Sequence, residues 1–265
     1  MNILYIGDVM GEMGIAAVEK VLPELRKSRD IDFVLAQVEN LSEGRGILPA
    51  DFERLRNAGV DFGTGGNWSL WRPEINDMMN DSDAPIVRPA NYPDDTPGVP
   101  YKYAHTQKGE VLVVSLMGQI VGRDADKETA NPLKTVDKIL ADELPEKRVA
   151  TIVNLHGDFS SEKFVFGYYL DGRVSLAVGD HWHVPTADAD VLPKGTAHIT
   201  DVGMCGSLDS SLGVTFDSVL PRWRDGHQTR NEFETGGRSQ FNALLVNVDE
   251  KSGNATSAEH IREIF

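Results

Sequence analysis

Runs of apolar, often β-branched residues alternate along the chain with stretches of helical hydrophobic periodicity. Such alternation predicts an α/β fold in which helices cover sheets. We expect strands at residues 2–8, 32–39, 60–64, 85–88, 111–117, 149–156, 174–179 and 196–201. We expect helices at residues 14–29, 49–58, 72–80, 132–142 and 161–170.

The pattern also indicates that the strands are not all parallel. Residues 101–117 predict a hairpin that turns at Lys108-Gly109, so the sheets should be mixed. From residue 205 to residue 240 the pattern weakens into Gly, Arg, Ser and Asp, and residues 241–249 then predict another strand. Because no flexible linker or internal repeat divides the chain, we expect a single domain over residues 1–265.

Unusual polar residues stand just beyond the carboxyl ends of the predicted strands. In open α/β sheets such ends gather at one edge, so residues far apart in the sequence would converge on one crevice. A lone Asp, Asn or His at such a place is more often a turn residue, a helix N-cap or a structural group. Several strand ends that carry only nitrogen and oxygen donors instead indicate one shared site. The residues are Asp8, Glu39, Asn40, Asn67, His156, His181 and His183.

The donor types in this set indicate a metal site. Imidazole, carboxylate and amide oxygen without sulfur suit Fe, Mn, Zn or Co, and a carboxylate such as Glu39 can bridge two ions about 3.5–4 Å apart. Two divalent ions would outweigh the negative charges of Asp8 and Glu39. The site would then be cationic and would attract a phosphate group.

The segment GDHWH at residues 179–183 carries two histidines in an H-x-H pattern. In a strand, residues i and i+2 point to the same side, so both imidazoles could face one metal cluster. An isolated H-x-H is more often an exposed pair. Gly179 before it and Thr186 after it indicate a tight loop, which favours the interpretation as ligands.

Composition narrows the possible partners and the cell compartment. The single cysteine, Cys205, excludes an internal disulfide framework and is typical of a reducing cytoplasm. The N-terminus has no basic stretch before its short apolar run, and no segment is long enough to span a membrane, so neither a signal peptide nor a membrane partner is expected. A formal net charge of −15 disfavours binding to nucleic-acid polymers but permits a small phosphorylated substrate.

Six motifs resemble the YmdB-like branch of the calcineurin-type metallophosphoesterases, and the similarity runs over nearly the whole chain. They are GDVMGEMG, ENLSEGRGI, GGNW, RPANYP, GDHWHVPTAD and LPKGTAHITDVGM. The resemblance implies a four-layer α/β/β/α sandwich of mixed sheets with a dinuclear metal centre at the strand ends. It also implies phosphodiesterase activity, notably on 2′,3′-cyclic nucleotides, simple phosphatase activity, and homo-oligomers.

The resemblance also implies which residues hold each ion. Asp8, Asn40 and His183 would hold one metal. Asn67, His156 and His181 would hold the other, and Glu39 would bridge the two.

One position departs from the family pattern at a place that matters for catalysis. Where the family reads GNH, this chain reads GNW, so Trp68 replaces the histidine that would protonate the leaving group. An indole cannot act as an acid near neutral pH, and losing a general acid costs about 10²–10⁴-fold in rate. Three explanations are open: slow turnover of activated or strained esters, a substitute acid, or a relative that binds metal without turnover. Asp180 is a candidate substitute acid, with a surface carboxylate or a partner for an imidazole as the alternatives.

Three further residues are candidates for substrate contacts. Trp182 also departs from the family pattern, and with Trp68 it could stack on a nucleobase or pack against the other indole. Arg88 in the RPANYP motif could clamp a phosphate or could hold its loop through backbone hydrogen bonds. Asn91 in the same motif is a weaker candidate.

The sequence therefore predicts a cytoplasmic phosphoesterase that depends on two metal ions and acts by metal-activated hydroxide attack on cyclic nucleotides or other small phosphate esters. The alternative is a metal- and nucleotide-binding regulatory protein whose catalysis is weakened because of Trp68.

Overall fold

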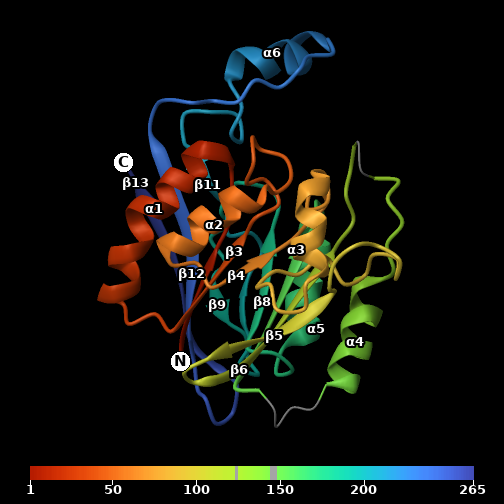
Figure 1. Ribbon diagram of the computed structural model, residues 1–265, viewed down its shortest axis with the longest axis vertical. Helices are drawn as coiled ribbons and strands as arrows, with labels where there is room; N and C mark the ends of the chain where they lie inside the picture. Colours follow the sequence, from red (N-terminus) through yellow and green to blue (C-terminus); the bar gives the residue numbers. More distant parts are fainter. Residues whose placement is uncertain (123–124, 144–147) are drawn as a thin grey trace.

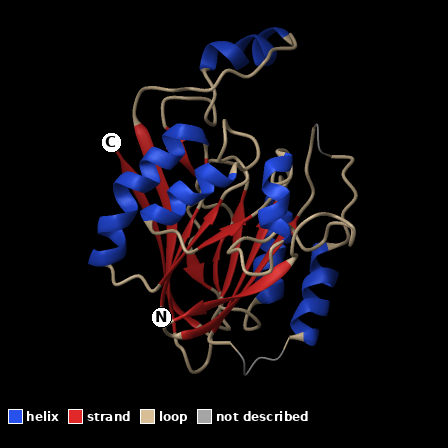
Figure 2. Ribbon diagram, viewed as in Figure 1, coloured by secondary structure: helices blue, strands red, loops and turns tan. Residues whose placement is uncertain are grey.

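A computed structural model describes residues 1–122, 125–143 and 148–265 of the chain. It contains two mixed β-sheets that pack face to face, with helices on both outer faces (Figures 1 and 2). This is the four-layer α/β/β/α arrangement expected from the sequence. Among the described helices, none has both the length and the apolar composition that crossing a bilayer requires.

The first sheet has the strand order β2-β11-β12-β1-β3-β4, with β13 paired to the outer side of β12. Neighbours β1, β3 and β4 are parallel, whereas β12 runs antiparallel to β1, β11 and β13. The bounds are β1 Asn2–Ile6, β2 Asp8–Val9, β3 Phe33–Gln37, β4 Phe62–Thr64, β11 Met204–Ser207, β12 Ser239–Val248 and β13 Ala255–Ile264.

The second sheet has the order β5-β6-β7-β8-β10-β9. Its inner strands β6, β7, β8 and β10 are parallel, and β5 and β6 form the expected antiparallel hairpin. The bounds are β5 Tyr101–Thr106, β6 Gly109–Met117, β7 Ala150–His156, β8 Leu176–Asp180, β9 Asp190–Val191 and β10 Ala197–Ile199.

Alternation along β1 explains why the sheet is buried on both faces. Ile3 and Tyr5 point into the layer between the two sheets, while Leu4 and Ile6 point to the helices of the first sheet. The helices on that outer face are α1 Gly11–Ser28, α2 Pro49–Ala58, and the 3₁₀ turn η1 Pro73–Ile75 that leads into α3 Asn76–Asn80. Helices α4 Pro132–Asp142 and α5 Ser160–Leu170 cover the second sheet.

Several elements differ from the sequence prediction. Residues 85–88 form no strand and contribute only isolated bridges, such as Gly63 to Ile86. Four elements were not predicted: β9, β11, β13 and helix α6 Phe216–Asp225. Helix α6 lies in the segment of weak pattern and stands apart from the layered body at the top of Figure 1. Helix α6 has amphipathic spacing, but it is short and holds Pro221, which argues against a helix in the sequence.

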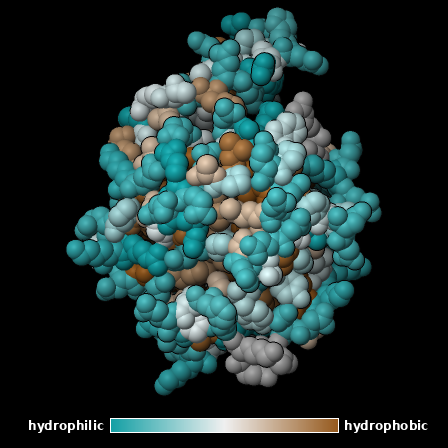
Figure 3. Space-filling view, in the orientation of Figure 1, coloured by the Kyte–Doolittle hydropathy of each residue, from teal (hydrophilic) through white to brown (hydrophobic). Residues whose placement is uncertain are grey.

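Hydrophilic side chains dominate the face of the molecule seen in Figure 3, in keeping with the formal net charge of −15. Such a surface is common in a protein of this composition. The polar residues of functional interest are therefore distinguished by their burial rather than by their number.

Candidate metal centre

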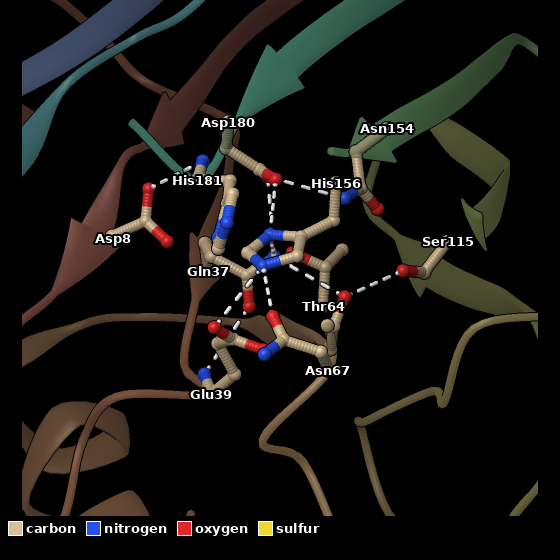
Figure 4. Close-up of polar contacts among 12 residues, drawn as sticks. Asp8, Gln37, Glu39, Thr64, Asn67, Ser115, Asn154, His156, Asp180 and His181 are labelled. Carbon is tan, nitrogen blue, oxygen red and sulfur yellow. Dashed lines mark hydrogen bonds and ion pairs between the residues drawn. The ribbon is translucent and has the colours of Figure 1, made fainter. Parts of the chain in front are cut away.

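The carboxyl ends of the parallel strands converge at one edge of the two sheets, and the seven predicted ligand residues lie there. Figure 4 shows Asp8, Glu39, Asn67, His156 and His181 of this set. Each comes from a strand end or from the residues directly after one, as the sequence predicted. Asp8 begins β2, Glu39 and Asn40 follow β3, and Asn67 follows β4. His156 ends β7, and His181 and His183 follow β8.

His156 lies at the centre of one group of donors. Its Nε2 atom is 2.9 Å from Asn67 Oδ1 and 3.1 Å from Glu39 Oε1. The His181 ring lies beside it, with the two ring centroids 4.4 Å apart. Donor atoms of Glu39, His156 and His181 all lie within 4.8 Å of one another, which is a spacing that a single metal ion could span.

A second group of donors lies around His183. Its Nε2 atom is 3.3 Å from Asn40 Oδ1 and 3.9 Å from Asp8 Oδ1. The other carboxylate oxygen of Asp8 accepts a hydrogen bond of 3.1 Å from the backbone N–H of His181, which ties the two groups together. The seven residues therefore fall into two adjacent sets, with Glu39 in the set around His156.

The two histidines of the H-x-H segment are directed by a loop and not by the pleat of a strand. His181 and His183 both have positive φ angles, of 103° and 64°, where residues other than glycine are uncommon. Such strain persists only where the surroundings hold it. Gly179 just before the loop is required, because a Cβ there would lie 1.9 Å from the carbonyl oxygen of Thr200.

A buried ion pair holds this loop from behind. The Lys163 ammonium donates to Asp201 Oδ2 at 2.7 Å, and both side chains are fully buried. The same Asp201 oxygen accepts the backbone N–H of Trp182, and Asp201 Oδ1 accepts the backbone N–H of Gly203. The carboxylate thus fixes the residue between the two histidines.

The electrostatic surroundings shift the pKa values of these groups in different directions. Burial, and next to it the charge of Asp180, raises the pKa of Asp8 well above its ordinary value. Burial acts against ionisation of Glu39 too, but the adjacent His156 outweighs it and lowers the pKa of Glu39. Burial likewise disfavours charge on His156, yet Glu39 and Asp180 raise its pKa overall. Burial and the neighbouring His181 lower the pKa of His183 to about 4, so His183 is neutral at pH 7.

Two buried polar atoms support the fit of this site to metal ions. Asp8 Oδ1 and His181 Nδ1 have no hydrogen-bond partner within the described part of the chain. A buried polar atom without a partner is costly, so such atoms indicate a missing ligand. The donors are carboxylate, imidazole and amide groups, which suit first-row transition metals. Among the described residues, the set therefore fits a metal centre.

Asp180 does not line the metal cavity but lies behind His156. Its Oδ1 atom is 2.7 Å from His156 Nδ1, and its Oδ2 atom accepts hydrogen bonds from Tyr5, Gln37 and Asn154. The side chain is fully buried, and its neighbours, His156 above all, lower the pKa against the effect of burial. These contacts favour the alternative in which Asp180 orients an imidazole, and they give no support to its role as a substitute acid.

Trp68 and Trp182 both line a cavity of about 440 Å³ over the metal centre. The backbone N–H of Trp68 donates to Glu39 Oε2 at 2.8 Å, and its ring packs edge to face on Trp71 with centroids 5.0 Å apart. The Trp182 indole donates to the carbonyl oxygen of Asp158, and one ring face is covered by the Lys163 ammonium at 4.2 Å. Trp68 therefore has Trp71 as its aromatic partner, while Trp182 is held by the loop around it.

Arg88 and Asn91 are buried and bonded to the backbone. Arg88 donates to the carbonyl oxygens of Pro89, Thr96 and Gly98. Asn91 accepts from the N–H of Met117 and donates to two carbonyl oxygens. These contacts favour the structural alternative for Arg88, and neither residue is among the described residues that line the metal cavity.

Two parts of the site were missed in the sequence. Asp158 lies two residues after His156, and its Oδ1 atom is 3.4 Å from His181 Nε2. The spacing of two residues between His156 and Asp158 was the sequence signal for this carboxylate.

Residues 208–238, which we call the outer wall, cover the metal cavity from the far side and include α6. Weak patterning hid this segment, because its apolar residues do not face a core.

Sequence comparison finds relatives that carry the names of phosphodiesterases and phosphatases. The chain is 33% identical over 261 residues to a 2′,3′-cyclic-nucleotide 2′-phosphodiesterase of Bacillus subtilis, with 98% of this chain and 96% of the relative covered. It is 28% identical over 276 residues to a putative phosphatase/phosphodiesterase of Mycoplasma genitalium, covering 100% of this chain and 94% of the relative.

Solved structures show the same fold. A hypothetical protein from Thermus thermophilus has a TM-score of 0.90 at 33% identity, covering 100% of this chain and 99% of the other. A novel phosphatase from Mycoplasma pneumoniae has a TM-score of 0.92 at 28% identity, covering 100% and 93%. A putative 5′-nucleotidase from Staphylococcus aureus, at 16% identity and a TM-score of 0.59, shares the fold over 98% of this chain and 54% of its own. The YmdB-like protein family matches residues 4–261, and the chain belongs to this family.

Proposed function

We propose that the protein is a metal-dependent phosphoesterase that hydrolyses small phosphate esters, with phosphodiesters as its main substrates. The observation that carries the proposal is the convergence of nitrogen and oxygen donors from separate strand ends, among them Asp8 and His181 with buried atoms that have no hydrogen-bond partner among the described residues. The named relatives are a phosphodiesterase and putative phosphatase/phosphodiesterases, which supports a hydrolase.

The two sets of donors support a dinuclear arrangement. In this proposal Asp8, Asn40 and His183 hold one ion, and Asn67, His156 and His181 hold the other. Glu39, which lies in the set around His156, would be the ligand shared by the two ions, as the family resemblance implies. When bound, two ions of Fe, Mn or Zn would bind the phosphate oxygens and make a water molecule acidic enough to attack near neutral pH.

The residues around the ions have separate tasks. Asp180 accepts the His156 Nδ1 proton, which leaves Nε2 free to bind a metal. Glu39 is held by the backbone N–H of Trp68, so its carboxylate stays oriented. The indoles of Trp68 and Trp182 line the cavity and exclude water from the reacting phosphate. Since neither indole donates a proton to a leaving group readily, we expect esters with good leaving groups to react fastest.

A cyclic nucleotide is the substrate we favour within this class. The Bacillus subtilis relative carries the name of a 2′,3′-cyclic-nucleotide phosphodiesterase. Trp182 lines the cavity over the metal centre and offers a ring on which a base could stack. The strained ring of such a substrate also lowers the demand for a general acid.

The alternative of a regulatory protein that only binds metal and nucleotide is not favoured. The curated relatives carry the names of a phosphodiesterase and of putative phosphatase/phosphodiesterases, and this chain has a donor residue at each of the seven predicted ligand positions. Trp68 weakens catalysis on poor leaving groups in our proposal without abolishing turnover.

The test is hydrolysis of bis(4-nitrophenyl) phosphate and of 2′,3′-cyclic AMP with manganese or iron supplied, for wild type, Trp68→His and Glu39→Gln. We expect wild type to cleave both substrates. Trp68→His should speed cleavage of 2′,3′-cyclic AMP, whose ribose oxygen is the poorer leaving group, by about 10²-fold. It should change cleavage of the aryl diester less, because a general acid helps a poor leaving group most. Glu39→Gln should lose both activities. Stoichiometric metal in wild type without cleavage of any phosphate ester would refute the proposal.

Two sequence expectations stay predictions. Cell fractionation would test the cytoplasmic location, and light scattering would test the homo-oligomer. Metal analysis by mass spectrometry would identify the ions.

A further inference from the structure

A second cavity of about 820 Å³ adjoins the cavity over the metal centre. Met10, Arg45 and Phe233 line both of them, so the two cavities meet at these side chains. A volume of this size is ordinary for a small-molecule site. Nothing in the proposed chemistry at the metal centre uses this space.

Arg45 stands at the junction between two indoles. Its guanidinium carbon is 4.8 Å from the centroid of the Trp68 ring and 5.8 Å from that of Trp71. Trp68 faces the metal cavity, whereas Trp71 lines the second cavity with 49% of its surface exposed. An arginine over aromatic faces is held in place by cation–π attraction. A cation therefore lies between two aromatic surfaces, one in each cavity.

A tight loop fixes the junction relative to the proposed ligands. The Asn40 amide donates to the carbonyl oxygen of Gly44, and the N–H of Gly46 donates to that of Glu39 at 2.7 Å. Both glycines have positive φ, and a Cβ on Gly44 would lie 2.3 Å from the Phe233 ring. The second cavity thus has a defined position next to the phosphate site.

The charges that line the second cavity indicate what it would accept. Four carboxylates face three guanidinium groups there, so a second phosphate gains no net attraction. The apolar and aromatic lining instead suits a neutral ring system. The four acids are Glu12, Glu43, Asp51 and Glu234, and the three bases are Arg45, Arg72 and Arg230.

We propose that the second cavity binds the second organic substituent of a phosphodiester, and that a nucleoside without a terminal phosphate fits it best. A dinucleoside monophosphate would then place one nucleoside over the metal centre, its phosphodiester beside Arg45, and the other base against Trp71. Hydrolysis adds water across one P–O ester bond and yields a nucleotide and a nucleoside. A 2′,3′-cyclic nucleotide, whose two ester oxygens belong to one ribose, would use the metal cavity alone. This inference rests on the proposed function.

The experiment compares adenylyl-adenosine, a dinucleoside monophosphate, with 2′,3′-cyclic AMP in wild type, Trp71→Ala and Trp71→Phe, all loaded with metal. We expect Trp71→Ala to lower kcat/KM for adenylyl-adenosine at least about five-fold more than for the cyclic nucleotide, because one base loses its stacking surface. Trp71→Phe keeps an aromatic face and should therefore retain most of the wild-type kcat/KM for adenylyl-adenosine. Equal losses on both substrates, or no loss on adenylyl-adenosine, would overturn the inference.

A binding measurement separates failure of this inference from failure of the proposed function. If metal-loaded wild type cleaves neither of these substrates nor bis(4-nitrophenyl) phosphate or any other phosphate ester, the proposed function fails. Calorimetry on the chelator-treated protein still tests the second cavity: adenylyl-adenosine should bind more tightly than adenosine monophosphate, and Trp71→Ala should remove the difference. Equal affinities in wild type would overturn the inference whatever the activity.

Discussion

The two walls of the metal cavity are built in opposite ways. The inner wall consists of the seven proposed ligands and the residues that hold them, and Asp8, Glu39 and His156 in it are fully buried. The outer wall, residues 208–238, exposes large apolar side chains, with Phe216 at 58% and Trp223 at 80%. Both walls line one cavity, and they meet where the carbonyl oxygen of Leu212 lies 3.2 Å from His183 Nδ1.

This difference in burial indicates that the two walls have different roles in the site. Buried charges need partners in fixed places, so the inner wall can change little without a large loss of stability or metal affinity. Helix α6 of the outer wall exposes Phe216 and Trp223, so we expect replacements there to change the shape of the cavity mouth at little cost in stability. We expect chemistry to depend on the inner wall and substrate choice on the outer wall and the adjoining cavity.

The largest difference between the walls should appear in thiol reactivity. Burial raises the pKa of Cys205, under the inner wall, from 9.0 to about 12. At pH 8 the native thiolate is then about 10³-fold less populated than in the unfolded chain, so iodoacetamide should label it only upon unfolding. The same shift makes unfolding more favourable as pH rises from 9 towards 12, because the unfolded chain loses the proton first.

A matched thiol on the outer wall is the control for this labelling. Gln228 is exposed, so Gln228→Cys in a Cys205→Ala background should react with iodoacetamide at the rate of a free thiol. Mass spectrometry after timed labelling measures both rates. Rapid labelling of native Cys205 would show that the inner wall opens readily.

Breaking the buried ion pair should cost most in stability. Lys163→Met leaves the Asp201 carboxylate buried without its cation, which should lower the free energy of unfolding by about 3–5 kcal/mol. The double variant with Asp201→Asn removes both charges and should recover part of the loss. Urea unfolding of the metal-free protein measures both variants, and a loss below about 1 kcal/mol for the single variant would contradict the role we give the pair.

Removing the charge behind His156 should weaken metal binding. Asp180→Asn keeps an oxygen for the His156 Nδ1 proton but loses the negative charge, and we expect a metal affinity about 10- to 100-fold lower, in the usual range for such partners. Tyr5→Phe, which removes one hydrogen bond to Asp180, should have a smaller effect. Calorimetric titration with manganese measures the affinities. An unchanged affinity in Asp180→Asn would leave the carboxylate with a packing role only.

The smallest effect should come from the outer wall. Trp223 is 80% exposed, so Trp223→Ser should change the free energy of unfolding by less than about 0.5 kcal/mol. The same urea titration serves as the measurement. A loss above about 1 kcal/mol would show that α6 contributes to the stability of the body and would weaken the contrast between the walls.

Much of the fold followed from the sequence because hydrophobic period and strand position are local properties. The elements at β7 and α2 were predicted within a residue of their bounds. Residues 85–88 were misjudged as a strand, since their apolar character comes from filling the core beside β4 and not from pairing along a ladder. Helix α6 was missed because its apolar side chains face solvent and the cavity instead of a core.

The candidate site divides in the same way. The placement of Asp8, Glu39 and His156 after predicted strands was enough to group them, because parallel strands bring their carboxyl ends to one edge. Asn67 lies beside His156 and Asn40 beside His183, while the assignment of these residues to two ions stays a prediction from the family resemblance. Spacing alone could not show that His181 and His183 adopt positive φ, or that Asp180 turns inwards to His156.

The layered α/β architecture, the family and the residues that could bind metal were thus predictable from the amino-acid sequence. Three features required the three-dimensional structure: the carboxylate that orients a histidine, the arginine between two cavities, and the position of residues 208–238 over the site. The physical reason is that periodicity and residue type act over a few neighbouring residues. The direction of a buried side chain, by contrast, depends on partners from distant strands that must satisfy its charge and hydrogen bonds.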